Sequence, residues 1–206
     1  MQLRSNFTDY YDWAFDKSGP VFHRMNDDKG PSKQRQFYIM QEAGFRIPAV
    51  GYVGNLKTLS CNKIVIYTDE QAHGGQGKKL IGRNDAWHAY ATMFASEFVG
   101  TPGLSWRRLQ VGPSVFWLEY KSSESWMSNV GDGSCEVIGV EMYAGFHPKI
   151  DLPLFAIDFA IADEMYAIDF NVAPGVRGSG VERYLTGKQF VEKLELAHEW
   201  GIWRCT

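Results

Sequence analysis

Residues 152–176 read LPLFAIDFAIADEMYAIDFNVAPGV and alternate between large apolar and small or acidic side chains. Successive side chains of a β-strand point to opposite faces, so this alternation predicts two strands with one bulky face toward the core. A two-residue turn at Asp163 and Glu164, the tightest common hairpin connection, would place Asp158 directly opposite Asp169. The other face carries Leu154 and otherwise alanines, two carboxylates and an amide, and is expected to leave room for a bound group: Ala156, Asp158, Ala160, Ala167, Asp169 and Asn171.

Two carboxylates that face each other directly repel, so Asp158 and Asp169 need a positive charge between them. A divalent cation supplies that charge, and Asn171, two residues along the same face, adds an amide oxygen of the kind that Mg²⁺ accepts. Two carboxylates and an amide without a nearby His or Cys favour a hard cation over zinc or copper. The hairpin therefore predicts a magnesium site at Asp158, Asp169 and Asn171. The alternative is an amphipathic ribbon whose acidic face is simply solvated.

The composition is that of a folded chain with no general attraction to polyanions. Its 206 residues are 45% hydrophobic, 15% aromatic and 22% charged, and the formal net charge is -3. These values exclude a disordered chain and do not indicate nucleic acid as a partner. Cys61, Cys135 and Cys205 lack metal-binding spacing, and no window has the roughly 18 apolar residues of a membrane span. We expect a cytoplasmic protein without a membrane segment.

Glycine and proline residues divide the rest of the chain into short elements. Helical spacing and end signals predict three helices after an irregular N-terminal arm over 1–31: 32–45, 83–94 and 186–202. Runs of β-branched residues predict further strands at 49–53, at 63–67, in both halves of 107–120 and at 135–143. The segment TDEQAHGGQGKKLIG at 68–82 is expected to be a mobile cationic loop. Strands and helices mix without regular alternation, which favours an α+β fold.

Several of these pieces resemble the ATP-grasp family and occur in the family's order. AIDF at 156–159 followed by AIDFNVAPGV at 167–176 resembles its metal-binding end, an acid on one strand and then an acid-x-Asn-x-x-Pro-Gly segment. The resemblance places Asp158, Asp169 and Asn171 on the three magnesium positions. The family usually has Glu where this chain has Asp169.

Upstream segments extend the resemblance to roughly residues 30–185. RRLQVG resembles the family's Arg-x-x-x-Val-Gly strand and implies that Arg107 contacts phosphate. WMSNVGDG resembles a Trp-x-x-Asn-x-Gly-Gly segment of the ribosomal-protein glutamate ligase branch, which implies that Asn129 lies near the triphosphate. SEFV resembles the hinge whose backbone holds the adenine, and the residues implied there are Glu97, Phe98 and Val99.

Two features depart from the family. Its second phosphate lysine normally ends the strand that here reads KIVIY, and this chain has Tyr67 at that place. Lys78 or Lys79 would then reach the phosphates, and Lys33 is the candidate for the other lysine. The loop residues expected to touch the nucleotide are Gly74, Gly75, Gly77, Lys78 and Lys79, although the loop read alone is an ordinary solvated turn. We also expect a reduced form, because only about 30 residues precede the first helix where most members have a separate domain.

The resemblance implies two small lobes with antiparallel sheets and helices that enclose a nucleotide cleft, within a domain over 32–206. The small lobe is expected at about 49–98 and the large lobe at about 99–206. ATP and Mg²⁺ are the implied cofactors, and the substrates would be a small-molecule or peptide carboxylate and an amine. The implied reaction joins them through an acyl phosphate and releases ADP and phosphate. An ATP-dependent kinase and a non-catalytic nucleotide-binding module are the alternatives.

Overall fold

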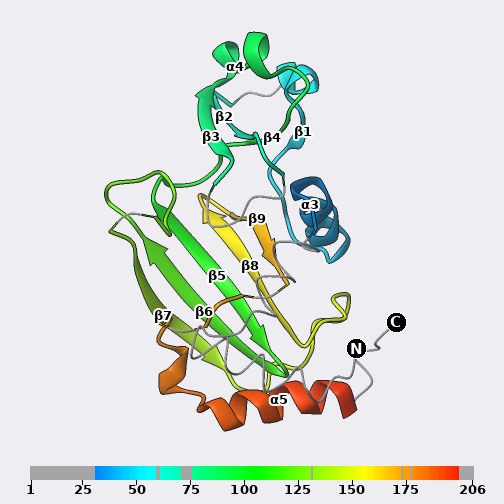
Figure 1. The fold of residues 1–206 in the computed structure, drawn as a ribbon, viewed down its shortest axis with the longest axis vertical. Helices are drawn as coiled ribbons and strands as arrows, with labels where there is room; N and C mark the ends of the chain where they lie inside the picture. The colour runs from blue at the N-terminus through cyan, green and yellow to red at the C-terminus, as the bar shows by residue number, and fades with distance from the viewer. Residues whose placement is uncertain are drawn as a thin grey trace.

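Two antiparallel sheets lie one above the other along the length of the molecule (Figure 1). The computed structural model describes residues 31–58, 61–70, 76–130, 132–172, 174–176 and 178–199. Except for Pro31, the expected N-terminal arm lies outside these residues. The combination of antiparallel sheets with separate helices confirms the expected α+β class.

The four-stranded sheet has the order β1-β4-β2-β3, and every neighbouring pair is antiparallel. Its strands are β1 (Val50–Tyr52), β2 (Lys63–Tyr67), β3 (Lys78–Gly82) and β4 (Phe94–Glu97). The 3-10 helix η2 (Val53–Thr58) and helix α4 (Arg83–Tyr90) lie at the end of the molecule away from the second sheet (Figure 1). One small core joins them to the sheet and consists of Val53, Leu56, Ile64, Ile66, Ala86 and Ala95.

The five-stranded sheet has the order β7-β6-β5-β8-β9 and is also antiparallel throughout. Its strands are β5 (Leu104–Val111), β6 (Ser114–Lys121), β7 (Ser134–Glu141), β8 (Leu154–Ile161) and β9 (Met165–Asn171). A turn at Gly112 and Pro113 joins β5 to β6. Helix α5 (Gly187–Glu199), preceded by the 3-10 helix η3 (Val181–Arg183), lies across the end of this sheet farthest from the four-stranded one (Figure 1).

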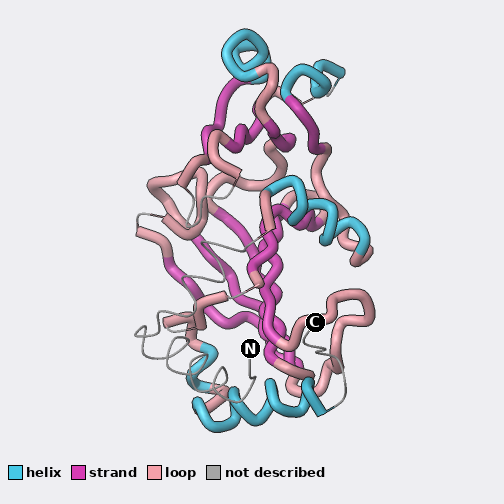
Figure 2. The backbone as a smooth tube through the Cα atoms, turned by 45° about the vertical axis from the view of Figure 1, so that its right-hand side comes forward, coloured by secondary structure: helices cyan, strands magenta, loops and turns pink. Residues whose placement is uncertain are grey.

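Helix α3 (Lys33–Glu42) packs beside β9 (Figure 1, Figure 2). Both of its ends follow the sequence signals. The Ser32 hydroxyl accepts a hydrogen bond from the amide of Arg35 at 3.3 Å and so caps the first turn. Gly44 follows the last turn with φ of +92°, a left-handed conformation that favours glycine. Phe37 and Met40 are fully buried on the inner side. This anchoring fixes the first turn of α3 next to the hairpin acids.

Both faces of strand β8 are buried along most of its length, which corrects the expectation that the whole second face is open. Phe155, Ile157 and Phe159 pack into a core with α3 and the four-stranded sheet. Leu154 and Ala156 belong to a second core that α5 and the loop before it cover. Alternation showed that two faces exist but not that helix α5 would return to cover the second one. The part of that face near Asp158 and Ala160 borders a cavity.

The hairpin register confirms the pairing of Asp158 with Asp169, but the expected two-residue turn is wrong. The connection has three residues, and β9 carries a bulge, because Phe159 pairs with Ala167 whereas Asp158 pairs with Asp169. Ile168 is therefore the extra residue. The bulge moves Ala167 into the core with Phe159, so Ala167 does not share a face with Asp169 as expected.

Two other expectations change. Lys78 and Lys79 lie in strand β3 and not in a loop, because residues 78–82 pair with all of β2. The ladder extends to Lys78, so both lysines are held within the sheet. Helix α4 ends at Tyr90 and not at Phe94 as expected, and Phe94 lies in β4 instead. Gly74 and Gly75 lie outside the described residues.

In the part of the chain that the structure describes, no helix is long and apolar enough to cross a membrane.

Candidate functional site

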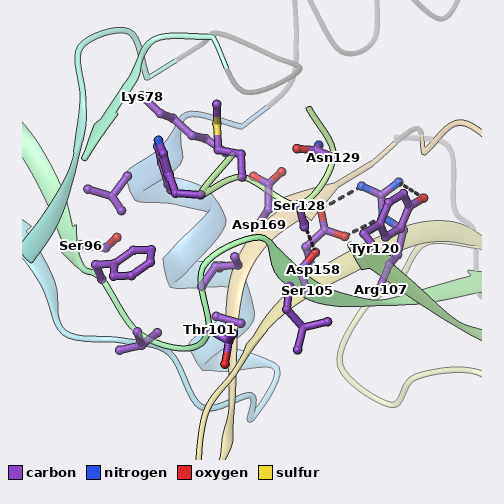
Figure 3. Close-up of a pocket in the computed structure, with 18 of the residues that line it drawn as sticks. Lys78, Ser96, Thr101, Ser105, Arg107, Tyr120, Ser128, Asn129, Asp158 and Asp169 are labelled. Atoms are coloured by element: carbon purple, nitrogen blue, oxygen red, sulfur yellow. Dashed lines mark hydrogen bonds and ion pairs between the residues drawn. The ribbon is translucent and has the colours of Figure 1, made fainter. Parts of the chain in front are cut away.

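A cavity lies at the junction of the two sheets, and both sheets contribute side chains to it (Figure 3). The four-stranded sheet and the segment that leaves it supply Val65, Tyr67, Lys78, Ser96, Glu97, Phe98, Val99 and Thr101. The five-stranded sheet supplies Leu104, Ser105, Arg107, Tyr120, Asp158, Ala160, Ile168 and Asp169. The connection between β6 and β7 adds Trp126, Met127, Ser128 and Asn129.

Asp158 is held by Arg107, its direct partner on the neighbouring strand β5. Arg107 donates from Nε to Oδ1 at 2.6 Å and from Nη2 to Oδ2 at 2.8 Å, and the two side chains are only 14% and 12% exposed. Burial alone would lower the pKa of Arg107, but the adjacent carboxylate more than offsets this and raises the pKa above its ordinary value. Arg107 also donates to the Tyr120 hydroxyl at 3.3 Å and lies 5.0 Å from the centre of that ring. The pair is a fixed, bidentate element of the cavity wall.

Asp169 pairs with Lys33, which opens helix α3. Lys33 is 3% exposed, and its ammonium also donates to Oε1 of Gln36 at 2.9 Å. The same Gln36 oxygen accepts from the amide of Phe170 at 3.3 Å, which ties the helix to β9. Burial lowers the pKa of Lys33, the neighbouring charge of Lys78 lowers it further, and Asp158 opposes both. The premise that the facing acids need a metal for neutralisation is therefore wrong, since each has its own cation.

The two lysines of β3 point to opposite sides. Lys78 lines the cavity, pairs directly with Tyr67 and is half-buried. Burial lowers its pKa, Asp158 raises it and Arg107 lowers it, so its ammonium lies within electrostatic range of the pair on β5 and β8. Lys79 is exposed and donates to the Tyr90 hydroxyl at 3.2 Å. Of the two candidates, only Lys78 faces the site.

The expected hinge lines the opposite side of the cavity, but two of its amides are already used. The amide of Glu97 donates to the carbonyl of Ala49 at 2.8 Å, and that of Phe98 donates to Lys63 at 3.1 Å. Any nucleobase contact with these two residues must therefore use other atoms. Phe98 meets Trp126 edge to face at 6.0 Å, which makes this end of the cavity apolar and aromatic.

Segment 126–129 is held against the cavity by hydrogen bonds at each end. The Ser128 and Ser105 hydroxyl groups lie 2.5 Å apart and are buried. The amide of Gly103 donates to the Trp126 carbonyl at 3.0 Å. These contacts fix Asn129 at the cavity rim, on the same side as the acids (Figure 3).

The cavity brings together most of the residues that the sequence indicated. Those that line it are Lys78, Glu97, Phe98, Val99, Arg107, Asn129, Asp158 and Asp169. Lys33 contacts the site through Asp169, whereas Gly77, Lys79 and Asn171 are not among the lining residues. Asn171 lies two residues beyond Asp169, roughly 7 Å farther along the strand, which takes it past the cavity.

Sequence reasoning missed several contributors, among them Tyr120, Ile168 and Trp126. The contact of Tyr120 with Arg107 could not be predicted because it depends on the β5–β6 register, which the turn at Gly112 and Pro113 determines. Ile168 faces the cavity only because of the bulge. Trp126 was part of a quoted motif, but its position against Phe98 depends on a loop that no periodicity describes.

The donor set fits a magnesium ion in part. Mg²⁺ is usually held by one or two carboxylates together with water and substrate phosphates, and Asp158 and Asp169 face the same cavity. Among the described residues, no group of three or more His, Cys, Asp or Glu is arranged to hold a metal ion. Two carboxylates alone therefore need further oxygens, such as those of a phosphate, to complete a site, and the role of Asn171 as a third ligand stays a prediction.

Comparisons with known proteins identify the fold. No protein-family model matches the chain, and no curated protein matches it. Among solved structures, the ATP-grasp ligase PsnB with a phosphomimetic variant of its minimal precursor, Mg and ADP has a TM-score of 0.57, at 13% identity over 88% of this chain and 63% of that one. An ATP-grasp ligase associated with ribosomally synthesised peptides (RiPPs) from Chryseobacterium gregarium, in complex with ADP and a leader and core peptide, has a TM-score of 0.53 at 17% identity. The match covers 89% of this chain and 62% of the C. gregarium ligase.

The similarity extends to a ligase for a small substrate. D-alanine–D-alanine ligase from Bacillus anthracis, complexed with ATP, has a TM-score of 0.50 at 10% identity over 86% of this chain and 69% of that one. The chain spans less than two thirds of the length of the PsnB and C. gregarium structures. Sequence identities this low show a shared fold and do not show a shared activity. The shared arrangement of the two sheets shows that the chain has the ATP-grasp fold.

Proposed function

We propose that the chain is an ATP- and Mg²⁺-dependent ligase that joins a carboxylate to an amine. The observation that carries the proposal is the pair of facing acids, Asp158 and Asp169, at the junction of the two sheets of an ATP-grasp fold. Each acid touches a buried cation, and the opposite end of the same cavity is aromatic. A nucleoside triphosphate has this polarity, with an apolar ring at one end and negative charge at the other.

The nucleobase would lie at the aromatic end, beside Phe98 and Val99, with Glu97 at the edge of the sheet. The phosphates would extend toward Arg107 and Lys33, with Asn129 as an amide donor at the rim. Magnesium ions held by Asp158 and Asp169 would neutralise the phosphate oxygens and polarise the terminal phosphoryl group. When magnesium neutralises the two acids, Arg107 and Lys33 would be released in part from their ion pairs. Each could then direct a hydrogen-bond donor to a phosphate oxygen.

The reaction itself needs positioning more than a protein nucleophile. An oxygen of the substrate carboxylate attacks the terminal phosphorus, the bond to the ADP oxygen breaks, and an acyl phosphate forms. The amine then attacks the acyl carbon, phosphate leaves, and the amine loses a proton. Arg107 would stabilise the negative charge that develops during phosphoryl transfer, and the closely packed walls around Ser105 and Ser128 would exclude water from the acyl phosphate.

The substrates belong to the classes of carboxylates and amines, and peptides are the first class to test. The C. gregarium structure contains a leader and core peptide, and the PsnB structure contains a precursor variant. D-alanine–D-alanine ligase shows that the same fold also serves a small substrate. A screen should therefore pair peptide carboxylates and free amino acids with peptide and small amines.

The test is ADP release in the presence of Mg²⁺ and ATP, with product mass determined by mass spectrometry. We expect ADP release to depend on both an acid and an amine, and an amide product one water lighter than the sum of the substrates. A phosphorylated product that persists without an amine would instead establish a kinase. Asp169→Asn should abolish turnover, whereas Asp163→Asn, at the exposed hairpin turn, should leave it unchanged. Turnover retained in Asp169→Asn contradicts the role of that acid.

A nucleotide-binding module without ligase chemistry is the second candidate. It is favoured by the ion pairs themselves, because Asp158 and Asp169 are neutralised without a metal. Nucleotide binding that is unaffected by Mg²⁺, combined with no ADP release across the substrate screen, would support this function over the first.

A further inference from the structure

Gln36 is a buried amide on helix α3, one turn beyond Lys33. Its Oε1 accepts hydrogen bonds from the Lys33 ammonium at 2.9 Å and from the backbone amide of Phe170 at 3.3 Å. Its Nε2 donates to the carbonyl of Pro31 at 3.0 Å. Both ends of the side-chain amide are therefore bonded, and the place of its oxygen next to Lys33 is fixed from the helix and from β9 at once.

The partners of the Lys33 ammonium differ in how they would respond to a bound metal. Lys33 is 3% exposed, pairs with Asp169 and lies 5.6 Å from the centre of the Tyr67 ring. A lysine ammonium has only donors, so each partner that it loses leaves a buried N–H group unsatisfied. A magnesium ion at Asp169 would take the negative charge that now pairs with Lys33. The Gln36 oxygen is neutral and too far inside the helix packing to be drawn to the metal, so it would remain.

The charge of Lys33 is placed by contacts at its ammonium and not by its backbone. The backbone is anchored separately, because the amide of Lys33 donates to the carbonyl of Glu70 at 3.1 Å. The side chain is a flexible four-carbon stem, which an anchored backbone alone does not orient. A neutral amide oxygen suits this task better than a second acid, since it orients the ammonium and leaves its charge for an incoming anion.

Resting on the proposed function, we propose that Gln36 is a positioning residue, which keeps the ammonium of Lys33 at the cavity when a metal ion engages Asp169. Gln36 does not line the cavity, so it acts through Lys33 and not by touching the nucleotide. Loss of the hydrogen bond that places this charge weakens nucleotide binding by about 10-fold. The loss should depend on the metal, because without a metal Asp169 still holds Lys33.

The experiment is isothermal titration of ADP, with Mg²⁺ or with a chelator in its place, into wild type, Gln36→Met and Gln41→Met. Gln41 is the matched control, because it lies on the same helix but is exposed. With Mg²⁺ we expect Gln36→Met to weaken ADP by about 10-fold, and with the chelator we expect a change within about twofold. Gln41→Met should match wild type under both conditions.

A double-variant cycle shows whether Gln36 acts through Lys33. In the Lys33→Met background, adding Gln36→Met should weaken ADP by no more than a further factor of about two, whereas independent effects would multiply. Multiplied losses would overturn the inference. So would an equal loss of ADP affinity with Mg²⁺ and with the chelator in Gln36→Met, because a general structural defect does not depend on the metal.

Unfolding midpoints of all the variants separate a binding defect from a folding defect. If Gln36→Met does not fold, a crystal structure of the wild-type chain with Mg²⁺ and ADP gives the answer. A Lys33 ammonium still bonded to Gln36 Oε1, with Asp169 at the metal, supports the inference, and an ammonium turned away from Gln36 overturns it. Failure of the wild-type chain to bind ADP would overturn the proposed function, whereas wild-type binding with an unaffected Gln36→Met overturns only the role of Gln36.

Discussion

The ion pair between Arg107 and Asp158 permits a quantitative test of how the cavity wall is built. The two side chains are 14% and 12% exposed and share two hydrogen bonds of 2.6 Å and 2.8 Å. Removing one partner of a buried pair leaves an uncompensated charge, which costs about 3–5 kcal/mol. Because both groups retain some exposure, we expect Arg107→Met and Asp158→Leu each to lower the free energy of unfolding by about 3 kcal/mol.

The double variant separates charge from packing. Replacing both members of a buried pair with apolar residues of similar size is often nearly neutral, so the double variant should lose only about 1 kcal/mol. If the two effects were independent, the losses would add to about 6 kcal/mol. The expected coupling is therefore several kcal/mol, far above the error of the method.

The assay is urea unfolding followed by tryptophan fluorescence, with the dependence on urea concentration compared among the four proteins. A loss of 3 kcal/mol corresponds to a shift of the thermal midpoint of about 6–12 °C for a chain of this length. A double variant that is as unstable as the two single losses combined would refute the reasoning, because the two groups would then not act as one buried pair.

Three further predictions concern other parts of the chain. Tyr120→Phe keeps the ring beside Arg107 but removes the hydroxyl acceptor, so urea unfolding should show a loss of about 1 kcal/mol, and an unchanged value would show that this bond contributes nothing. Gly112→Ala should lower the free energy of unfolding by at least about 1 kcal/mol more than Gly145→Ala. Both positions have positive φ, but a Cβ at Gly112 would overlap the backbone of α5, whereas one at Gly145 meets nothing within 4 Å. Equal losses in the two variants would contradict this packing. Burial and two neighbouring cations lower the pKa of His147, so the unfolded chain takes up the proton first and stability should fall as the pH drops below about 6.5. The free energy of unfolding of His147→Gln should therefore fall less between about pH 7.5 and about pH 5.5 than that of the wild type. Identical pH profiles would exclude this contribution.

The hairpin shows how far sequence reasoning reached. Alternation over 154–161 and 165–171 predicted both strands, because a period of two residues determines which side chains share a face. The pairing of Asp158 with Asp169 was predicted from a two-residue turn, and it holds because the three-residue connection and the bulge offset each other. It did not predict the bulge at Ile168. A bulge is set by how the hairpin packs on its neighbours, and the local pattern of apolar residues is the same with or without it.

The two ion pairs could not be predicted from the sequence for a related reason. Arg107 lies 51 residues before Asp158 in the chain, and their contact requires β5 to pair with β8. Lys33 reaches Asp169 only because α3 packs beside β9. Local periodicity carries no information about which distant elements meet, so the sequence indicated the acids and the cations separately but not their pairing.

At strand β3 a local sequence signal led to a wrong prediction. Three glycines close to two lysines are typical of a flexible turn, but residues 78–82 pair along the whole of β2 and turn Lys78 and Lys79 to different sides. The backbone hydrogen bonds of that ladder override the local preference for a loop. The sequence could name two lysines, and only the register distinguishes the one that faces the cavity.

The central claim is that the facing acids bind a nucleotide through a magnesium ion. Its most direct test is calorimetric titration of ATP into the wild-type chain and into Asp169→Asn, each with Mg²⁺ and with a chelator in its place. We expect one nucleotide per chain, tighter binding by wild type when Mg²⁺ is present, and no gain from Mg²⁺ in Asp169→Asn. A folded wild-type chain that binds no ATP, or one whose affinity is the same with and without Mg²⁺, would contradict the claim.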